Sequence, residues 1–245
     1  MRPKVHGERD PLAPIACRST FRLLSTLLLA ELADADLAVA EGSPTAIDRL
    51  PSPYPEEEQA VARAVAKRQH EYRAARRLFR EALAQLGAPP APLPSAPDRS
   101  PVWPEGFIGS VTHTDGWCGV VLARAAALVG VGVDVEKAGP LGQEVARRVL
   151  TADEQSQLHP DEIPHVSKLY FSAKESVYKC QYPATGMFLD FHALSIDFDH
   201  PAQSFRVRFH IEVPGFSGGR GGGIEGRYKI TSDYVATYAV RRRPG

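Results

Sequence analysis

The chain has 245 residues, of which 43% are hydrophobic and 24% charged, and its formal net charge at pH 7 is zero. This length and balance fit one large or two modest folded domains and exclude a chain too polar to form a core. Zero net charge excludes a molecule that binds nucleic acid through its overall charge. Cys17, Cys118 and Cys180 are far apart and lack metal-ligand spacing, which predicts a reducing, cytoplasmic setting without a disulfide framework or a zinc site.

The first third of the chain has a helical pattern. Residues 1–17 are polar and contain prolines, which predicts a loose terminus. The apolar run from Leu23 to Leu29 is too short to span a bilayer, and the acids and prolines before it fit a signal peptide poorly, so we expect a helix over about 19–34. Glu56 to Glu58 favour the start of a second, long helix that ends at Gly87.

The remainder alternates between strand and helix patterns. Residues 88–104 are rich in proline and predict an extended linker, and strands are expected over 107–113, 118–124 and 127–136. A capping box at Thr151 to Glu154 and a helical segment over 167–179 follow. Strands are expected over 194–199, 204–211, 226–231 and 234–241, and the glycine-rich segment 218–223 lacks the order of a phosphate-binding loop. Helices precede strands twice, which predicts an α/β (α+β) chain of two similar halves, 18–130 and 131–245, in one compact unit.

Two acids stand on one face of the strand at the junction of these halves. Asp134 and Glu136 alternate with Val131, Val133 and Val135, so the valines face a core while the carboxylates lie together on the opposite face, about 7 Å apart at Cα. Such a pair, taken alone, is usually the solvated face of a strand. A third acid, Glu175, comes from the later helix, and a few oxygen ligands completed by water and a phosphate are what Mg²⁺ prefers.

Three further groups of residues carry chemistry that phosphate recognition needs. Basic residues line the long helix, among them Arg68 and Arg76, and arginine binds phosphate through two hydrogen bonds. His113 ends a strand after small and hydroxyl residues. Glu175 and Lys179 are four residues apart on a helix, where they could equally form an ordinary surface ion pair.

Four blocks of residues in order resemble the large, single-chain 4′-phosphopantetheinyl transferases of the surfactin and enterobactin type. These blocks are Gly132-Val-Asp-Val-Glu136, Phe171-Ser-Ala-Lys-Glu-Ser-Val-Tyr-Lys179, the segment Pro101 to His113, and the helix Lys67 to Arg76. The similarity runs from about Pro55 to Arg241. It implies a fold of two α/β halves related by a pseudo-two-fold axis. It also implies Mg²⁺-dependent transfer of 4′-phosphopantetheine from coenzyme A (CoA) to a serine of an apo acyl or peptidyl carrier protein, releasing 3′,5′-ADP.

The resemblance also implies roles for individual residues. Asp134, Glu136 and Glu175 match the metal ligands, for Mg²⁺ or alternatively Mn²⁺, and Glu175 is the candidate base, with Lys179 beside it in the catalytic group. The residues that match CoA-binding positions are Arg68, Arg76, Ser110, Thr112, His113, Lys174 and Lys179. From the family architecture we expect a monomer that neither binds nucleic acid nor inserts into a membrane.

Some positions depart from the family pattern, and other functions stay open from the residues alone. Ser95 stands where enterobactin-type relatives often have a lysine near the 3′-phosphate, and Arg99 is a candidate substitute. The same three acids could serve a phosphodiesterase or nuclease, which would act without a carrier protein. The basic helix could instead belong to a nucleic-acid-binding module, whose binding would weaken steeply with salt.

Overall fold

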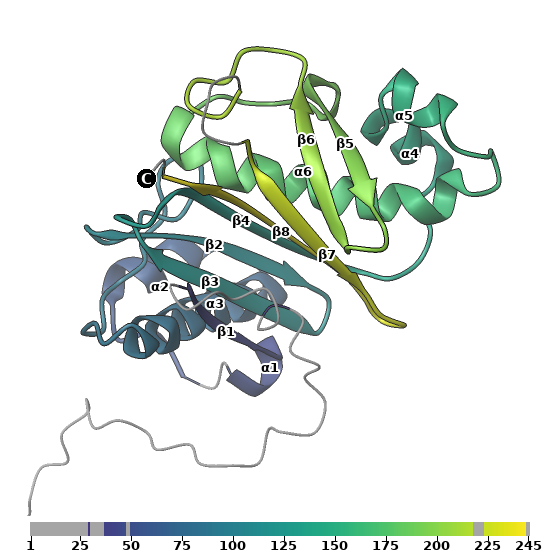
Figure 1. Ribbon diagram of the computed structural model, residues 1–245. Helices are drawn as coiled ribbons and strands as arrows, with labels where there is room; N and C mark the ends of the chain where they lie inside the picture. The colour runs from purple at the N-terminus through teal and green to yellow at the C-terminus, as the bar shows by residue number, and fades with distance from the viewer. Residues whose placement is uncertain (1–28, 30–36, 48–49, 218–222, 244–245) are drawn as a thin grey trace, which may run out of the picture.

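The computed structural model describes residue 29 and residues 37–47, 50–217 and 223–243. The terminus 1–17 lies outside these residues. Most of the helix expected over 19–34 and most of the glycine-rich segment 218–223 do as well. Within the described part, the chain forms two sheets, each covered by one long helix (Figure 1). The predicted α/β class is therefore confirmed.

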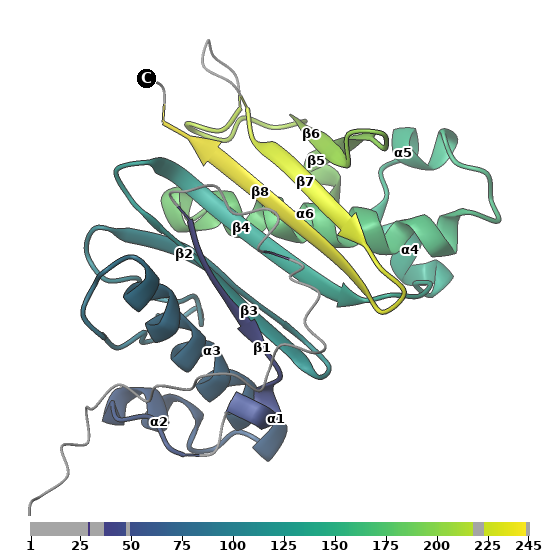
Figure 2. The same ribbon diagram turned by 60° about the horizontal axis from the view of Figure 1, so that its bottom comes forward.

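The N-terminal sheet has three antiparallel strands in the order β1-β3-β2. These are β1 (Leu37–Gly42), β2 (Phe107–Thr114) and β3 (Trp117–Arg124). Three helices accompany it: α1 (Pro44–Ile47), α2 (Pro55–Val61) and α3 (Ala66–Gln85). The apolar stripe of α3, which includes Leu78 and Phe79, is buried against β1 and β3 (Figure 2).

One prediction for this half is corrected, and one strand was missed. The helix expected from Glu56 to Leu86 is two helices, because the chain leaves the helical conformation between α2 and α3 and Val65 is extended at the N-cap of α3. Strand β1 was not predicted. Its buried residues are Ala38 and Ala40, whose small side chains give only a faint alternating hydrophobic signal.

The C-terminal sheet has five antiparallel strands in the order β4-β8-β7-β6-β5. Their bounds are β4 (Leu128–Lys137), β5 (Leu194–Asp199), β6 (Ser204–Phe209), β7 (Glu225–Ile230) and β8 (Tyr234–Arg242). The helices are α4 (Gln143–Val149), α5 (Ala152–Ser156), α6 (Ile163–Thr185) and the 3₁₀ helix η2 (Phe191–Ala193). The capping box is confirmed at the start of α5, while α4 was not predicted and α6 extends beyond both predicted ends. None of the helices in the described ranges is long and apolar enough to cross a bilayer.

The two halves meet where β2 runs beside β4 (Figure 1). Val131, Val133 and Val135 of β4 enter a core that also holds Val121 of β3 and Tyr238 of β8. Along this seam, β2 and β4 are joined by hydrogen bonds to side-chain hydroxyls and not by the backbone hydrogen bonds of a shared sheet. The β4 amides of Val133 and Val135 donate to the hydroxyls of two β2 residues, each at 3.0 Å. This seam fixes β4, and therefore its acids, against the N-terminal half.

Two glycines explain why α6 lies so close to β4. A Cβ atom on Gly130 would come within 2.1 Å of the Cys180 carbonyl oxygen, and one on Gly132 within 1.9 Å of the Ser176 carbonyl oxygen. Neither distance is physically possible, so any larger residue would push the helix away. Because side chains alternate along a strand, Asp134 and Glu136 share this glycine face. The sequence Gly-Val-Gly-Val-Asp-Val-Glu therefore aims its acids at α6.

Candidate active site

Asp134 of β4 and Lys179 of α6 form the contact at the centre of the site. The Lys179 ammonium donates to Asp134 Oδ1 at 2.6 Å and to the Val133 carbonyl at 3.2 Å, and the Thr112 hydroxyl donates to Oδ1 at 3.4 Å. Asp134 is 4% exposed. Its second oxygen, Oδ2, is buried and has no hydrogen-bond partner among the described residues. A buried carboxylate oxygen without a partner is costly, and a bound cation would satisfy it.

The neighbouring acids, Glu136 and Glu175, respond to burial and to one another. Burial raises the pKa of Glu136, and the charges of Asp134 and Glu175 raise it further. Burial also raises the pKa of Glu175, against the opposing effect of Lys179. In the described part of the chain no three such side chains converge on one point as metal ligands do. The acids therefore form a mutually repelling group beside the Lys179 ammonium, and a divalent cation would relieve that repulsion.

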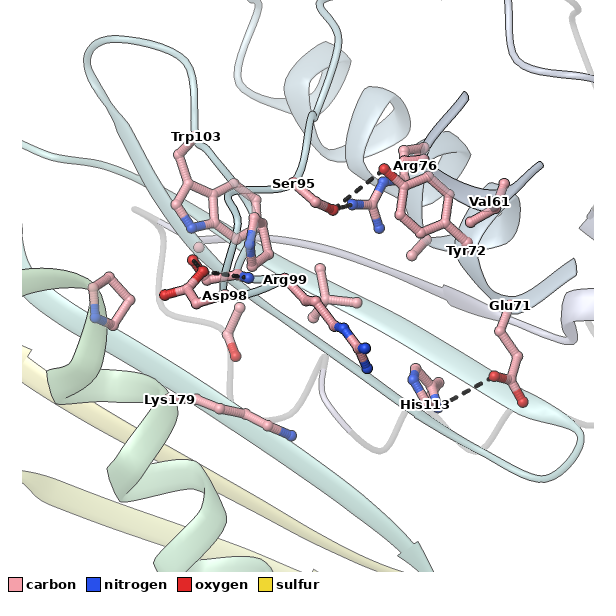
Figure 3. A pocket seen from close by; sticks show the side chains of 18 of the residues that line it. Val61, Glu71, Tyr72, Arg76, Ser95, Asp98, Arg99, Trp103, His113 and Lys179 are labelled. Atoms are coloured by element: carbon pink, nitrogen blue, oxygen red, sulfur yellow. Dashed lines mark hydrogen bonds and ion pairs between the residues drawn. The ribbon is translucent and has the colours of Figure 1, made fainter. Parts of the chain in front are cut away.

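A cleft of about 610 Å³ opens between the two halves beside Lys179. Residues from α3, β2 and the 95–103 segment line the N-terminal side of it, and α6 contributes Tyr178, Lys179, Tyr182 and Pro183. The three acids are not among the lining residues, but Lys179 links the cleft to Asp134. Figure 3 shows that the labelled basic side chains converge on this space from both halves.

Arg68 and His113 are in contact at the cleft, and the carboxylate of Glu71 lies close to both. Arg68 Nη1 lies 2.8 Å from His113 Nε2, and Glu71 Oε2 lies 3.7 Å from Arg68 and 3.8 Å from His113 Nδ1. Burial lowers the pKa of His113, Glu71 opposes that shift, and Arg68 adds to it. The lowered pKa favours the neutral imidazole, and a bound phosphate dianion would favour its protonation.

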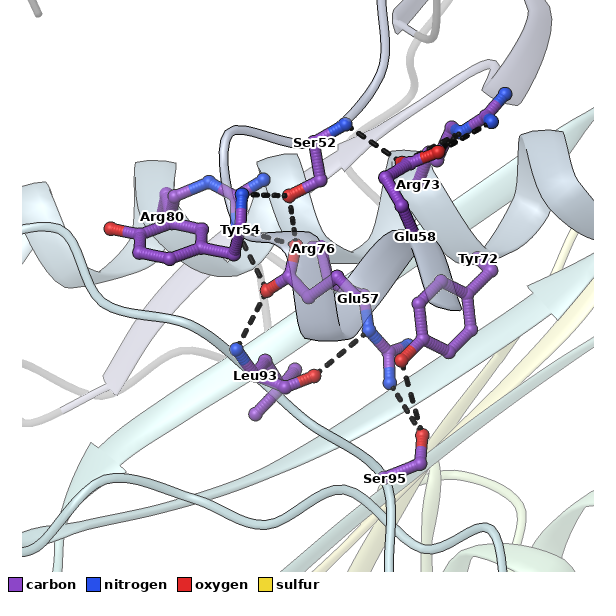
Figure 4. Close-up of polar contacts among 10 residues, drawn as sticks. All are labelled: Ser52, Tyr54, Glu57, Glu58, Tyr72, Arg73, Arg76, Arg80, Leu93 and Ser95. Atoms are coloured by element: carbon purple, nitrogen blue, oxygen red, sulfur yellow. Dashed lines mark hydrogen bonds and ion pairs between the residues drawn. The ribbon is translucent and has the colours of Figure 1, made fainter. Parts of the chain in front are cut away.

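Arg76 is buried, and most of its guanidinium is already engaged. It donates to the Leu93 carbonyl at 3.1 Å and to the Ser95 hydroxyl at 3.0 Å, and it lies over the Tyr72 ring, 3.4 Å from the centroid (Figure 4). The Ser95 hydroxyl thus accepts from Arg76. Arg76 lines the cleft and at the same time fixes the linker that borders it.

Two other arginines of α3, Arg73 and Arg80, are held by acids of α2. Arg73 donates to both carboxylate oxygens of Glu58, and Arg80 Nη1 lies 3.1 Å from both carboxylate oxygens of Glu57 (Figure 4). Glu57 is 1% exposed and also accepts from the Leu93 amide. These arginines stabilise the N-terminal half. Their engagement with α2 does not favour the nucleic-acid module considered above.

Lys174 does not line the cleft, so the structure does not bring it together with the other residues expected to bind CoA. Its ammonium is buried in the C-terminal half and donates to Glu154 Oε2 at 2.7 Å and to the carbonyls of Val149 and Phe191 at 2.8 and 2.9 Å. Successive helical residues point about 100° apart, so Lys174 cannot share the face on which Glu175 and Lys179 lie. We assign Lys174 a structural role.

Ser110 and Thr112 lie on the seam between the halves. Both are buried, and their hydroxyls accept from the Val133 and Val135 amides of β4. Ser110 also lines the cleft, whereas Thr112 is not among its lining residues. Their position ties the N-terminal side of the cleft to the strand that bears the acids.

Several cleft residues were not singled out from the sequence. Glu71 and Tyr72 fall inside the quoted Lys67 to Arg76 block, and Trp103 falls inside the Pro101 to His113 block, so the motifs themselves could have identified them. Asp98 and Tyr182 come together only in the folded chain, through a hydrogen bond of 2.7 Å. No sequence pattern indicates that contact.

The site combines a basic surface from one half with clustered carboxylates from the other, a combination typical of enzymes that act on phosphorylated ligands. Comparison with known families gives the class. Residues 56–123 match the 4′-phosphopantetheinyl transferase N-terminal domain, and residues 130–239 match the 4′-phosphopantetheinyl transferase superfamily. The chain belongs to the 4′-phosphopantetheinyl transferase superfamily, whose members use CoA and act on carrier proteins.

Named sequence relatives agree with this assignment. The 4′-phosphopantetheinyl transferase Svp of Streptomyces mobaraensis is 41% identical over 190 residues, covering 75% of this chain and 76% of the relative. The 4′-phosphopantetheinyl transferase PptT of Mycobacterium tuberculosis (strain ATCC 25618 / H37Rv) is 35% identical over 196 residues, covering 77% and 86%. Enterobactin synthase component D of Salmonella typhi is 36% identical over 118 residues, covering 46% and 48%. A solved holo-ACP-synthase from Plasmodium yoelii is 16% identical with a TM-score of 0.35, covering 48% of this chain and 97% of that one.

Proposed function

We propose that this chain transfers the 4′-phosphopantetheine group of CoA to a serine of an apo acyl or peptidyl carrier protein, and that the cleft between its halves binds CoA. The observation that carries the proposal is the position of Lys179. It lies on the wall of the cleft and contacts Asp134 of the acidic group. One ligand can therefore reach the basic residues of the N-terminal half and the carboxylates of the C-terminal half together.

The acids fit a divalent cation, which we propose to be Mg²⁺ or Mn²⁺. Asp134, Glu136 and Glu175 would hold it. The buried Oδ2 of Asp134, without a partner among the described residues, and the raised pKa values of the two glutamates are what a cation would relieve. When bound, the metal would neutralise charge on the pyrophosphate of CoA and on the departing 3′,5′-ADP.

The basic residues of the N-terminal half fit the 3′-phosphate of the adenosine. Arg68 and His113 are in contact with one another, and Arg76 is fixed beside them through Leu93 and Ser95. Arg99 also lines the cleft and is a fourth candidate. Phosphate binds arginine bidentately, so this side of the cleft would anchor the nucleotide while Lys179 contacts the pyrophosphate.

Glu175 is the group that we propose as the base. The carrier serine hydroxyl attacks the phosphorus that bears pantetheine, a new phosphorus–oxygen bond forms, and the bond to the bridging oxygen of ADP breaks. The serine must lose its proton, and a carboxylate whose pKa is raised by burial is a better acceptor near neutral pH than an exposed one. Positioning and charge neutralisation supply the rest of the acceleration.

The partners are proposed on the same basis. CoA and an apo carrier domain are the two substrates, and we propose that the protein acts as a monomer in the cytoplasm.

Cys118 and Cys180 are buried free thiols, and burial raises the pKa of Cys118 to about 12, so the Cys118 thiol is unreactive where it lies.

Mass spectrometry tests the proposal directly. Incubation with CoA, Mg²⁺ and a panel of apo acyl and peptidyl carrier proteins is expected to add one phosphopantetheine group to a carrier serine. The matched control is each carrier with that serine replaced by alanine, which should gain no mass. Unchanged masses across the whole panel would refute the proposed function.

A further inference from the structure

The segment between Pro94 and Val102 forms a short hairpin at the edge of the cleft. Ser95 pairs with Pro101, the Ala96 amide donates to the Ser100 carbonyl at 2.8 Å, and the Val102 amide donates to the Pro94 carbonyl at 2.9 Å. Arg99 stands at its tip with a φ of +71°, in the left-handed region that a residue with a side chain seldom adopts. Such a conformation persists only where surrounding contacts enforce it.

Asp98 supplies those contacts. Its Oδ1 accepts from the Ser100 amide at 2.9 Å and from the Ser100 hydroxyl at 2.6 Å, which closes the turn around Arg99. Its Oδ2 accepts from the Tyr182 hydroxyl of α6 at 2.7 Å. Both carboxylate oxygens are thus engaged, one within the hairpin and one across the cleft.

The Tyr182 ring is itself held in place by a neighbouring aromatic ring. It stacks on Tyr178, with ring centroids 5.1 Å apart and an interplanar angle of 27°. It also lies three residues after Lys179 on α6, which places it on the helix that presents the acidic site. The hydrogen bond from Tyr182 to Asp98 therefore connects the hairpin of the N-terminal half to α6 of the C-terminal half.

Arg99 is the side chain that this arrangement orients. It is an exposed residue that lines the cleft together with Arg68, Arg76, His113 and Lys179. In Figure 3 it extends from the hairpin into the space between the halves. A mobile loop would lose backbone entropy when the arginine at its tip bound a phosphate, and a fixed backbone lowers that loss.

We propose that Tyr182 is a positioning residue for nucleotide recognition: through Asp98 it holds the hairpin so that Arg99 contacts the 3′-phosphate of CoA. This inference rests on the proposed function and deepens it, because it makes selection of the nucleotide depend on a residue of the opposite half. The Ser95 hydroxyl accepts a hydrogen bond from Arg76 and carries no charge. On this wall of the cleft, Arg99 therefore adds its positive charge to that of Arg76.

Steady-state kinetics with CoA and with 3′-dephospho-CoA test the inference. Tyr182→Phe keeps the ring and removes only the hydroxyl. It is expected to raise KM for CoA about tenfold, the loss typical of one hydrogen bond to a charged group, with kcat nearly unchanged. KM for 3′-dephospho-CoA should not change, because that substrate lacks the phosphate that Arg99 contacts. Tyr170→Phe on the same helix, whose ring packs on Phe198 away from the cleft, is the matched control and should leave both substrates unaffected.

A double-mutant cycle separates positioning from a general structural effect. Arg99→Gln should raise KM for CoA at least as much as Tyr182→Phe does, and the two changes together should add little to Arg99→Gln alone. Additive effects, an equal rise of KM for both substrates, or an unchanged KM for CoA in Tyr182→Phe would each overturn the inference. Absence of transfer by the wild-type protein would instead refute the proposed function, so the two failures are distinguishable.

Discussion

Two ion pairs on one helix have opposite characters. Lys174 pairs with Glu154 in the interior of the C-terminal half, and Lys179 pairs with Asp134 at the edge of the cleft. Both join a lysine of α6 to a buried carboxylate, at 2.7 and 2.6 Å. The difference lies in how many of the remaining polar atoms have partners.

The Lys174 pair is fully satisfied. The ammonium makes three hydrogen bonds, and the two carboxylate oxygens of Glu154 also accept from the Thr151 and Ile196 amides. The Lys179 pair leaves Asp134 Oδ2 buried without a partner in the described residues. A completed network stabilises a fold, whereas an incomplete one beside a cleft indicates a place for a ligand.

The largest expected effect is on catalysis. Glu175→Gln removes the proposed base and one metal ligand while keeping the side-chain volume, so kcat for carrier modification should fall about a thousandfold. The free energy of unfolding should stay within about 1 kcal/mol of wild type, because the substitution removes a carboxylate that burial disfavours. Single-turnover mass spectrometry and urea unfolding measure the two quantities. Retained turnover would remove Glu175 from the site.

Lys174→Met should mainly lower stability, the reverse of the outcome expected for Glu175→Gln. It leaves the Glu154 carboxylate buried without its ammonium, and breaking a buried pair costs about 3–5 kcal/mol of unfolding free energy. Lys168→Met, on the same helix and only partly buried, is the control and should change stability by less than about 1 kcal/mol. Urea unfolding compares them. Equal stability of the two variants would show that the interior pair is not structural.

Lys179→Met tests the other lysine of the comparison. We expect kcat/KM for CoA to fall about tenfold to a hundredfold, because a charge-assisted hydrogen bond to phosphate is lost. The loss of stability should be smaller than for Lys174→Met, since Lys179 is 27% exposed and water can reach it. Kinetics and unfolding of both variants check this order. A larger stability loss in Lys179→Met would reverse the assignment of the two pairs.

The smallest expected effect concerns His113. Burial lowers its pKa below the ordinary value of 6.5, so the unfolded chain binds a proton more readily than the folded one. Stability contributed by the neutral imidazole is present above pH 6.5 and is lost as the pH falls through the folded pKa. His113→Gln should therefore lose less stability than wild type between pH 7 and pH 5. Thermal unfolding across that range measures the difference, and parallel curves would contradict it.

The sequence predicted the parts of the site that depend on local geometry. Alternation along a strand placed Asp134 and Glu136 on one face, and helical spacing placed Glu175 with Lys179. The glycines at 130 and 132 then explain how closely α6 approaches. The sequence did not predict contacts that depend on tertiary structure. Lys174 lay in the same motif but faces the interior, and the Asp98–Tyr182 contact joins residues that are far apart in the chain.

Coupled binding of metal and CoA tests the central claim most directly. The three acids are proposed to form only part of a metal site, which the pyrophosphate of CoA completes. Electron paramagnetic resonance of Mn²⁺ titrated into wild-type protein and Asp134→Asn, with and without CoA, measures the coupling. We expect tight Mn²⁺ binding by the wild type only in the presence of CoA, and a loss of that tightening in Asp134→Asn. Mn²⁺ binding that is indifferent to CoA, or unchanged in the variant, would contradict the account.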